Sequence, residues 1–305
     1  MLKTNSIKED NQKINLAVRL PNWIGDTLMT FPMLKSLENA GIDFTCIGHP
    51  WAKDLFSGEN FKIIVSSDVK KVKWAHRIYR THKFNYGIAC PNTFSATLPM
   101  RLAGLKTIGY HWLSGIRPKY LNNQHTVENY FELGCPFLDE IINTRSIKDK
   151  IIVHPDSAAE SLKIINEIGT PYIVVCPYAS NLHKGANKEW PYWDSFFEEF
   201  NEYKIVALVS PADEERCIKE FSKIMVISSD LSVTGAIMKN AKYVIANDSG
   251  AMHLASFYGA NIIGLFGVTD IHKTKPWYGR YLIGENQEFI SQEELIKTLK
   301  DSLLD

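Results

Sequence analysis

The sequence predicts an α/β protein made of two Rossmann-like lobes, each with a parallel sheet, that face a central cleft. Short apolar runs typical of buried strands alternate with amphipathic helical stretches in both halves of the chain. The 305 residues are enough for about two domains. Residues 142–150 are polar and mixed in charge, and we take them as the boundary between lobes of residues 14–150 and 151–305.

The composition is that of a globular protein, with 45% apolar and 22% charged residues. Residues 1–13 are polar and mixed in charge, which predicts a disordered tail and not a signal peptide. No apolar run approaches the ~20 residues that span a bilayer. The five cysteines are scattered, without a Cys-x-x-Cys pair, which argues against a disulfide framework or a zinc site and favours a cytoplasmic location.

The first lobe is expected to open with a strand at residues 14–20, a loop at residues 21–27, and a helix that reaches Asn39 and stops at Gly41. Pro32 either bends this helix or marks its first regular turn, and the sequence leaves both open. Further strands are predicted at residues 43–48, 62–65, 86–89 and 107–109, and helices at residues 69–83 and 125–137.

The second lobe repeats the alternation. Its predicted strands are residues 172–177, 204–210, 225–228, 242–246 and 261–267, and its predicted helices are residues 191–201, 213–223, 232–240, 252–258 and 291–304.

One turn between a strand and a helix stands out, at Asn247-Asp248-Ser249-Gly250-Ala251-Met252-His253. It follows a buried strand and precedes a short helix that Gly259 is expected to stop, so free backbone N–H groups and a positive helix end point to an anion. Asp248 is the expected cap of this helix, and an ordinary capped turn is the alternative interpretation. Ligands of open α/β sheets lie beyond the carboxyl ends of the strands, where this loop and residues 22–26 of the other lobe are both expected.

Charge is distributed unevenly along the chain. The net charge is zero, which disfavours a nucleic-acid partner. No acidic residue lies between Asp68 and Glu128, and one lobe should therefore be cationic and meet an anionic partner or a membrane surface; a solvated basic face is the alternative. The basic residues of this interval are Lys70, Lys71, Lys73, Arg77, Arg80, Lys83, Arg101, Lys106, Arg117 and Lys119.

Several motifs, in the same order along the chain, resemble those of the glycosyltransferase family 9 heptosyltransferases, and type II more than type I. They are Asn22-Trp23-Ile24-Gly25-Asp26 with Met29 and Pro32, Ile108-Gly109-Tyr110, Val127-Glu128-Asn129-Tyr130, Lys188-Glu189-Trp190-Pro191, Asn247 to His253, and Leu265-Phe266-Gly267 with Thr269, Asp270, Thr274 and Pro276.

This resemblance implies a GT-B fold with the acceptor on the first lobe and the nucleotide-sugar on the second. It implies inverting transfer of heptose from ADP-heptose to the inner core of lipopolysaccharide, without a metal or other cofactor. The absence of an Asp-x-Asp motif agrees with that expectation. The sequence departs from the family pattern at Gly185-Ala186, at Ile271-His272 and in lacking a cysteine cluster near its end, which leaves the exact donor and acceptor open.

The chemistry assigns roles to particular residues. Asp26 is the predicted catalytic base, with an ordinary pKa near ~3.9 that makes it ionised but weakly basic, and capping of its helix is the alternative role. The residues expected to bind the diphosphate are Lys188, Asp248, Ser249, Gly250, Ala251 and His253. The residues expected on the nucleoside side are Glu214, Leu231 and Ser232, with Asp213 and Glu215 competing with Glu214 for the ribose.

The acceptor is expected to be an anionic lipopolysaccharide precursor, which carries carboxylates and phosphates and is anchored in the cytoplasmic leaflet. The enzyme would then touch the inner membrane peripherally, without insertion. The residues predicted to bind this acceptor are Asn22, Trp23, Gly25, Arg77, Arg80, Arg101 and Arg117.

Two other functions fit the same loops. A nucleotide-sugar epimerase of GT-B fold would share the diphosphate loop but would have no need of a cationic acceptor lobe. A binding protein without catalysis would keep the nucleotide, and the presence of Asp26 and Lys188 argues against it.

Overall fold

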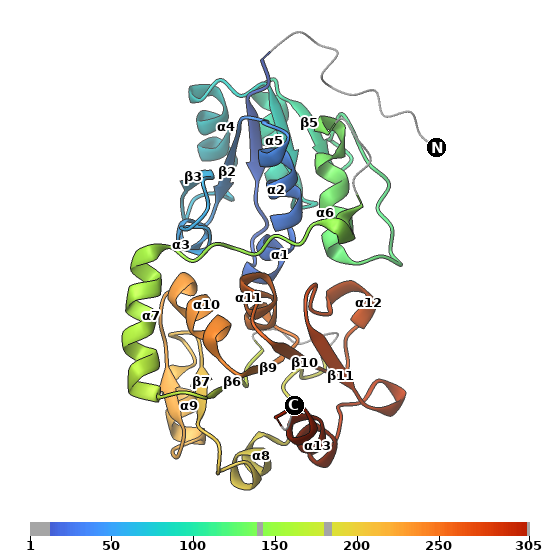
Figure 1. The fold of residues 1–305 in the computed structure, drawn as a ribbon. Coiled ribbons are helices and arrows are strands. Elements are labelled where there is room, and N and C mark those ends of the chain that lie inside the picture. The colour runs from blue at the N-terminus through green and yellow to red at the C-terminus, as the bar shows by residue number, and fades with distance from the viewer. Residues whose placement is uncertain (1–12, 139–142, 180–184, 304–305) are drawn as a thin grey trace. The chain divides into compact units, whose positions relative to one another are not determined.

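The computed structural model describes residues 13–138, 143–179 and 185–303, and the chain forms two compact units, Met1–Asp149 and Lys150–Asp305. Each unit contains one sheet in which every pair of neighbouring strands is parallel (Figure 1), which confirms the predicted α/β class. No helix in the described part of the chain has the length and apolar character needed to cross a membrane. The predicted disordered tail lies, apart from Lys13, outside the described residues.

The first unit has a five-stranded sheet in the order β3-β2-β1-β4-β5. Its strands are β1 (Leu16–Arg19), β2 (Phe44–Gly48), β3 (Lys62–Val65), β4 (Tyr86–Ala89) and β5 (Lys106–Gly109). Its helices are α1 (Ile24–Met29), α2 (Phe31–Asn39), α3 (Trp51–Leu55), α4 (Val72–Thr81), α5 (Phe94–Leu102) and α6 (Thr126–Gly134), with short 3₁₀ turns at Cys135–Phe137 and Thr144–Ser146.

The central strand β1 is buried along its whole length, between β2 on one side and β4 on the other. From β1 the chain goes to β2 on one side, and only after β3 does it cross to β4 on the other. The carboxyl end of β1 therefore lies where the strand order reverses, the usual place for a ligand in an open α/β sheet. The segment that leaves this point is the loop leading into α1.

The helix expected to run from this loop to Asn39 is two helices, separated at Thr30. Pro32 lies in the first turn of α2, where its missing N–H interrupts no hydrogen bond within the helix. The structure thus decides in favour of the first-turn position for Pro32. The N-cap of α1 is Trp23, without a side-chain cap, and Asp26 follows inside the first turn.

The second unit has a six-stranded sheet in the order β11-β10-β9-β6-β7-β8. Its strands are β6 (Ile173–Cys176), β7 (Ile205–Leu208), β8 (Met225–Ile227), β9 (Tyr243–Asn247), β10 (Ile262–Phe266) and β11 (Arg280–Ile283). Its helices are α7 (Pro155–Ile168), α8 (Trp193–Glu199), α9 (Glu214–Glu220), α10 (Leu231–Asn240), α11 (Gly250–Tyr258), α12 (Ile271–Thr274) and α13 (Gln292–Leu303), with a 3₁₀ turn at Glu285–Gln287.

The strand order of this sheet reverses between β6 and β9, which are paired and fully buried. Two loops leave the carboxyl ends of these strands. The loop after β6 contains the Lys-x-Trp-Pro motif, and the loop after β9 begins α11. Trp190 anchors the first of them, since its ring is 1% exposed in an aromatic core with Trp193, Phe196 and Phe200 and its indole N–H donates to the Ile290 carbonyl at 2.9 Å.

The sequence analysis did not identify helices α3, α5, α7 and α12 or strand β11. Helix α7 lies along one side of the second unit beside α10 (Figure 1), and only Ser161, Ile165 and Ile168 of its residues are buried. Strand β11 is an edge strand that pairs with β10 alone and has no buried residue. Both elements bury too little to carry a strong hydrophobic pattern.

Glycines determine how α10 and α11 pack in the second unit. Helix α11 ends, as predicted, at Gly259, which adopts the left-handed conformation at φ +82°. In α10, a Cβ at Gly235 would lie 2.6 Å from ring atoms of Tyr258, a side chain with 0% exposure. Because Tyr258 is enclosed, it has little freedom to move away.

We expect Gly235→Ala to destabilise the second unit by about 1–3 kcal/mol through this overlap, which exceeds the gain in helix propensity. The thermal unfolding midpoint should fall by roughly 2–4 °C per kcal/mol. Lys239→Ala, an exposed change on the same helix, is the control and should leave the midpoint almost unchanged. A Gly235→Ala midpoint equal to or above that of the unmodified chain would contradict the packing described.

Candidate functional site

The loop after β9 presents the amino end of α11. Asn247 is the last residue of the strand, Ser249 is the N-cap and Gly250 is the first helical residue. Ser249, Gly250 and Ala251 are half-buried, while every following residue of α11 through Tyr258 is buried. The first N–H groups of the helix have no partner within it, so an anion at this end would meet free donors and the positive end of the helix dipole.

Two buried polar atoms of this helix end lack a hydrogen-bond partner among the described residues. They are the Ser249 hydroxyl oxygen and the Nδ1 atom of His253. Buried polar atoms in proteins nearly always have partners, and exceptions need a cause such as an absent ligand. Together with the free helix N–H groups, they make this loop a candidate anion site.

Lys188 adds a positive charge beside the loop. Its Nζ donates to the backbone carbonyl of Asp248 at 2.6 Å and lies 3.7 Å from a carboxylate oxygen of the same residue. The side chain of Lys188 is 17% exposed and that of Asp248 is 9% exposed. The loop after β6 and the loop after β9 therefore meet at this ion pair.

The role expected for Asp248 needs correction. Ser249, and not Asp248, is the N-cap of α11, and no side chain caps the helix. The carboxylate of Asp248 would repel a phosphate and instead lies close to the ammonium of Lys188. Asp248 therefore pairs with Lys188 in this structure, and its expected contact with a diphosphate stays a prediction.

His253 lies one turn inside α11 and is 4% exposed. Burial, followed by the nearby charge of Lys188, lowers the pKa of His253 to about 4. The imidazole is therefore neutral near pH 7 and offers a hydrogen bond, but no positive charge, to an anion. Lys188 and the helix end remain to neutralise charge.

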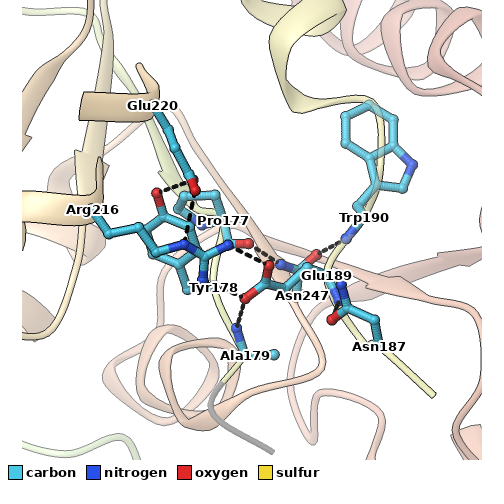
Figure 2. Close-up of polar contacts among 9 residues, drawn as sticks. All are labelled: Pro177, Tyr178, Ala179, Asn187, Glu189, Trp190, Arg216, Glu220 and Asn247. Carbon is cyan, nitrogen blue, oxygen red and sulfur yellow. Dashed lines mark hydrogen bonds and ion pairs between the residues drawn. The ribbon is translucent and has the colours of Figure 1, made fainter. Parts of the chain in front are cut away.

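Asn247 joins these segments and was not among the predicted site residues. Its side chain is 0% exposed. Its Oδ1 accepts from the backbone N–H of Trp190 at 3.0 Å, and its Nδ2 donates to the Pro177 carbonyl at 2.5 Å, as Figure 2 shows. One amide thus connects the end of β9, the end of β6 and the Lys-x-Trp-Pro segment. The available signal was an Asn at the junction of a buried strand and a turn.

The residues expected on the nucleoside side lie at the starts of two helices. Glu214 is the first residue of α9 and is half-buried, whereas the Asp213 carboxylate accepts from the Ser210 hydroxyl at 2.6 Å. Leu231 and Ser232 begin α10, and Ser232 is 1% exposed, with its hydroxyl 2.5 Å from that of Ser157 in α7. Glu215, the next residue of α9, is exposed, so Glu214 and Glu215 both stay candidates for a ligand hydroxyl.

In the first unit, Asp26 is half-buried in the first turn of α1. Its Oδ1 accepts from the hydroxyl of Tyr130, in α6, at 3.2 Å. Burial raises the pKa of Asp26, and the Tyr130 hydrogen bond opposes that rise. The expectation of an ordinary, weakly basic carboxylate was therefore wrong, because Asp26 is a stronger base than a solvated Asp. No side-chain cap was found for α1, so the alternative role as a cap is not supported.

The loop before Asp26 begins at Arg19, a residue that the sequence analysis missed. Arg19 is 2% exposed at the end of β1, and its guanidinium donates to the Leu20 carbonyl and to Asn22 Oδ1, the latter at 2.6 Å. Burial lowers the pKa of Arg19, and its Nε has no partner among the described residues. A charged residue in an otherwise apolar strand was the available signal. Trp23, next in the loop, is 60% exposed.

The predicted acceptor residues do not form one cluster. Arg77 and Arg80 are exposed and lie in the second half of α4. The C-cap of α4, His82, accepts from Asn15, which precedes β1. Arg80 is therefore near the amino edge of the sheet, opposite the edge that carries Asp26, and the predicted contact of these arginines with an acceptor stays a prediction.

Arg101 and Arg117 are both exposed and lie beside the edge strand β5. Arg101 is in the last turn of α5, with its guanidinium 3.6 Å from the position of a Cβ at Gly115. Arg117 follows Ile116, which forms a bridge with Ile108 of β5. At the carboxyl ends of β1 and β2, the nearby positive charges are instead Arg19 and Lys70, which both lower the pKa of His49, after burial as the first cause.

No group of three or more His, Cys, Asp or Glu side chains that would hold a metal ion was found in the described part of the chain.

Comparison with known proteins gives consistent matches. The family model described as glycosyltransferase family 9 (heptosyltransferase) matches residues 74–299, a range that begins after the Asn22–Asp26 loop. Lipooligosaccharide heptosyltransferase 2 of Campylobacter jejuni is 25% identical over 283 residues, which cover 87% of this chain and 84% of that protein.

Two solved structures show the same fold. The ADP-heptose lipopolysaccharide heptosyltransferase II of E. coli matches with a TM-score of 0.77 at 18% identity, over 95% of this chain and 99% of that one. An E. coli heptosyltransferase solved with ADP matches with a TM-score of 0.73 at 17% identity, over 95% and 100% of the two chains. These likenesses confirm the predicted GT-B fold class.

The contact between Tyr130 and Asp26 predicts a titration shift. The Tyr130 hydroxyl stabilises the ionised carboxylate, and Tyr130→Phe removes that stabilisation while desolvation remains, so the pKa of Asp26 should rise further. Carboxyl-carbon NMR of Asp26 would follow its titration in both proteins. Tyr110→Phe is the matched control, because the Tyr110 hydroxyl donates to the Asn129 carbonyl of the same helix. An Asp26 midpoint that stays in place or falls in Tyr130→Phe would contradict the assigned hydrogen bond.

Proposed function

The chain belongs to glycosyltransferase family 9, the heptosyltransferases, and from this premise we propose that it transfers heptose from ADP-heptose to the inner core of lipopolysaccharide, as a type II enzyme. The observation that carries the donor side is the end of α11, where free N–H groups, the unpartnered Ser249 and His253 atoms and Lys188 are gathered. The relative from Campylobacter jejuni is named as a heptosyltransferase 2, and a related E. coli structure contains ADP. Both support the type and the nucleotide.

On this proposal, the second unit binds the nucleotide-sugar. The diphosphate lies against the N–H groups of Ser249, Gly250 and Ala251, with a hydrogen bond from neutral His253 and the positive charge of Lys188. Glu214, at the start of α9, accepts from a ribose hydroxyl, and the Leu231–Ser232 segment lies on the adenine side. Without a metal, these donors and Lys188 take up the negative charge that develops on the leaving diphosphate.

The first unit supplies the base. Asp26 takes the proton of the acceptor hydroxyl while the hydroxyl oxygen bonds to the anomeric carbon of the donor. The bond from that carbon to the diphosphate oxygen breaks at the opposite face, so ADP leaves and the configuration is inverted. The raised pKa of Asp26 supports this role, because burial alone increases the proton affinity of the carboxylate.

The acceptor is an anionic lipopolysaccharide precursor. Trp23, exposed at the edge that carries Asp26, offers a ring for stacking on a sugar, beside Asn22 and Gly25. Lys70 and the buried Arg19 provide positive potential at this edge. Lys73, Arg77 and Arg80 recur at helical spacing on α4 with exposed side chains, and we assign this row to peripheral contact with the anionic cytoplasmic face of the inner membrane.

Asp26→Asn tests the catalytic assignment. We expect kcat to fall by about 10²–10⁴-fold, since the amide accepts no proton, while the dissociation constant of ADP stays the same. Both quantities follow from steady-state transfer kinetics and calorimetric titration with ADP.

Asp43→Asn is the matched control for this experiment. Asp43 pairs with Lys62 at 2.6 Å just before β2, at the amino edge of the same sheet. Its substitution should leave kcat within about twofold, as expected for a surface ion pair. Near-normal turnover by Asp26→Asn would overturn the role of Asp26 as the base.

A further inference from the structure

Two backbone hydrogen bonds fix the segment around Lys188. The N–H of Glu189 donates to Asn187 Oδ1 at 3.0 Å, a contact that spans Lys188. The N–H of Trp190, two residues after Lys188, donates to Asn247 Oδ1 at 3.0 Å. The side chain of Glu189 also fixes the position of this segment, since its charged carboxylate is only 18% exposed and forms an ion pair.

The carboxylate of Glu189 forms a bidentate ion pair with Arg216 of α9. The two terminal guanidinium nitrogens donate to the two carboxylate oxygens at 3.1 and 2.9 Å, the paired geometry that gives arginine its directional strength (Figure 2). The backbone N–H of Ala179, after β6, donates to the same carboxylate at 3.4 Å. Glu189 therefore joins three segments of the second unit.

Arg216 is itself held from two further directions. Its Nε donates to Glu220 Oε1 at 3.0 Å, and its guanidinium lies 4.1 Å from the centre of the Tyr178 ring. The Tyr178 hydroxyl donates to the other oxygen of Glu220 at 2.8 Å, which closes a ring of contacts. The pKa of Arg216 is raised, first by its hydrogen bonds with Glu189. Each of the three guanidinium nitrogens thus donates one hydrogen bond, and one face lies against the Tyr178 ring.

This network connects the two sides of the proposed donor site. Arg216 lies two residues after Glu214, the candidate for the ribose, and Glu189 is adjacent to Lys188, the candidate for the diphosphate. Tyr178 follows Pro177, whose carbonyl accepts from Asn247. The row of contacts therefore runs from α9 to the loop that begins α11.

We propose that the Glu189–Arg216 pair is a positioning device that holds Lys188 at the donor diphosphate and fixes its distance from Glu214, so that the pair controls donor affinity. This inference rests on the proposed function of the donor site. Arg216 and Glu189 act through Lys188 and touch no reacting atom. An ion pair that served the fold alone would change stability and leave the selectivity between ligands untouched.

Calorimetric titration of the full chain with ADP tests the device. Arg216→Lys keeps the charge but loses the fork, and Glu189→Gln keeps the shape but loses the charge. Each should weaken ADP binding by about five- to tenfold, in the range of coupling between contacting residues. The affinity for AMP, which has a single phosphate for Lys188 to contact, should fall less in these variants. Thermal unfolding of each variant checks that it is folded. If Arg216→Lys does not fold, Glu189→Gln tests the proposal by itself.

Lys219→Gln is the matched control, since it removes an exposed positive charge from the same helix, three residues after Arg216. It should change the affinity for ADP by less than about twofold, as expected for an exposed charge away from the ligand.

A double-mutant cycle with Lys188→Ala decides whether Arg216 acts through Lys188. In the Lys188→Ala background, Arg216→Lys should cause no further loss of ADP affinity. An equal loss in both backgrounds, or no loss in the unmodified background, would overturn the positioning role while leaving the proposed function intact. If Lys188→Ala alone leaves ADP binding unchanged, the diphosphate assignment itself fails, and the two failures are therefore distinguishable.

Discussion

The buried side-chain amide of Asn247 is the contact on which the donor half of this protein depends. A completely buried amide must satisfy both its donor and its acceptor, and here the partners are backbone groups of two other segments. The end of β9 therefore cannot move independently of Pro177 or of Trp190. Trp190 in turn is buried in the aromatic core, and this fixes the backbone from which the Lys188 side chain extends to Asp248. Hydrophobic burial and polar satisfaction together fix where the positive charge lies.

The first unit uses burial in a different way. The Arg19 guanidinium at the end of β1 is buried, and the Asp26 carboxylate in the first turn of α1 is partly buried. No contact between these two groups was found in the described part of the chain. Burial lowers the pKa of Arg19 and raises that of Asp26, so each shift favours the neutral form. Tyr130 tempers the shift of Asp26 through one hydrogen bond. This arrangement is costly for stability and is typical of residues kept for chemistry.

Much of this structure could be predicted from the sequence, and the predictions that failed did so for physical reasons. The central strands and the two informative loops were predictable, because buried parallel strands are continuous apolar runs and Gly259 ends α11 as expected. Helix α7 was missed although Pro155 stands at its first position, since its few buried residues give little pattern. Arg80 lies near the amino edge of the sheet because α4 runs antiparallel to the strands. The distribution of charge along the sequence gives no information about this direction.

The contacts that tune the site could not be predicted, because they join residues far apart in the sequence. Tyr130 is 104 positions from Asp26, and Arg216 is 27 positions from Glu189. Both residues lie on helices whose apolar pattern predicts a helix and not the partner of one polar side chain. The pKa of Asp26 follows from burial in the folded chain, so an ordinary value was the only one that the sequence supported.

The most direct test of the account is a product assay with ADP-heptose and a lipid acceptor bearing inner-core carboxylates and phosphates, followed by mass spectrometry. The account predicts that the acceptor gains the mass of one heptose residue, that one ADP is released for each transfer, and that chelation of divalent metals leaves the rate unchanged. Epimerised sugar formed from the donor without acceptor, or binding of the donor without any transfer, would contradict it.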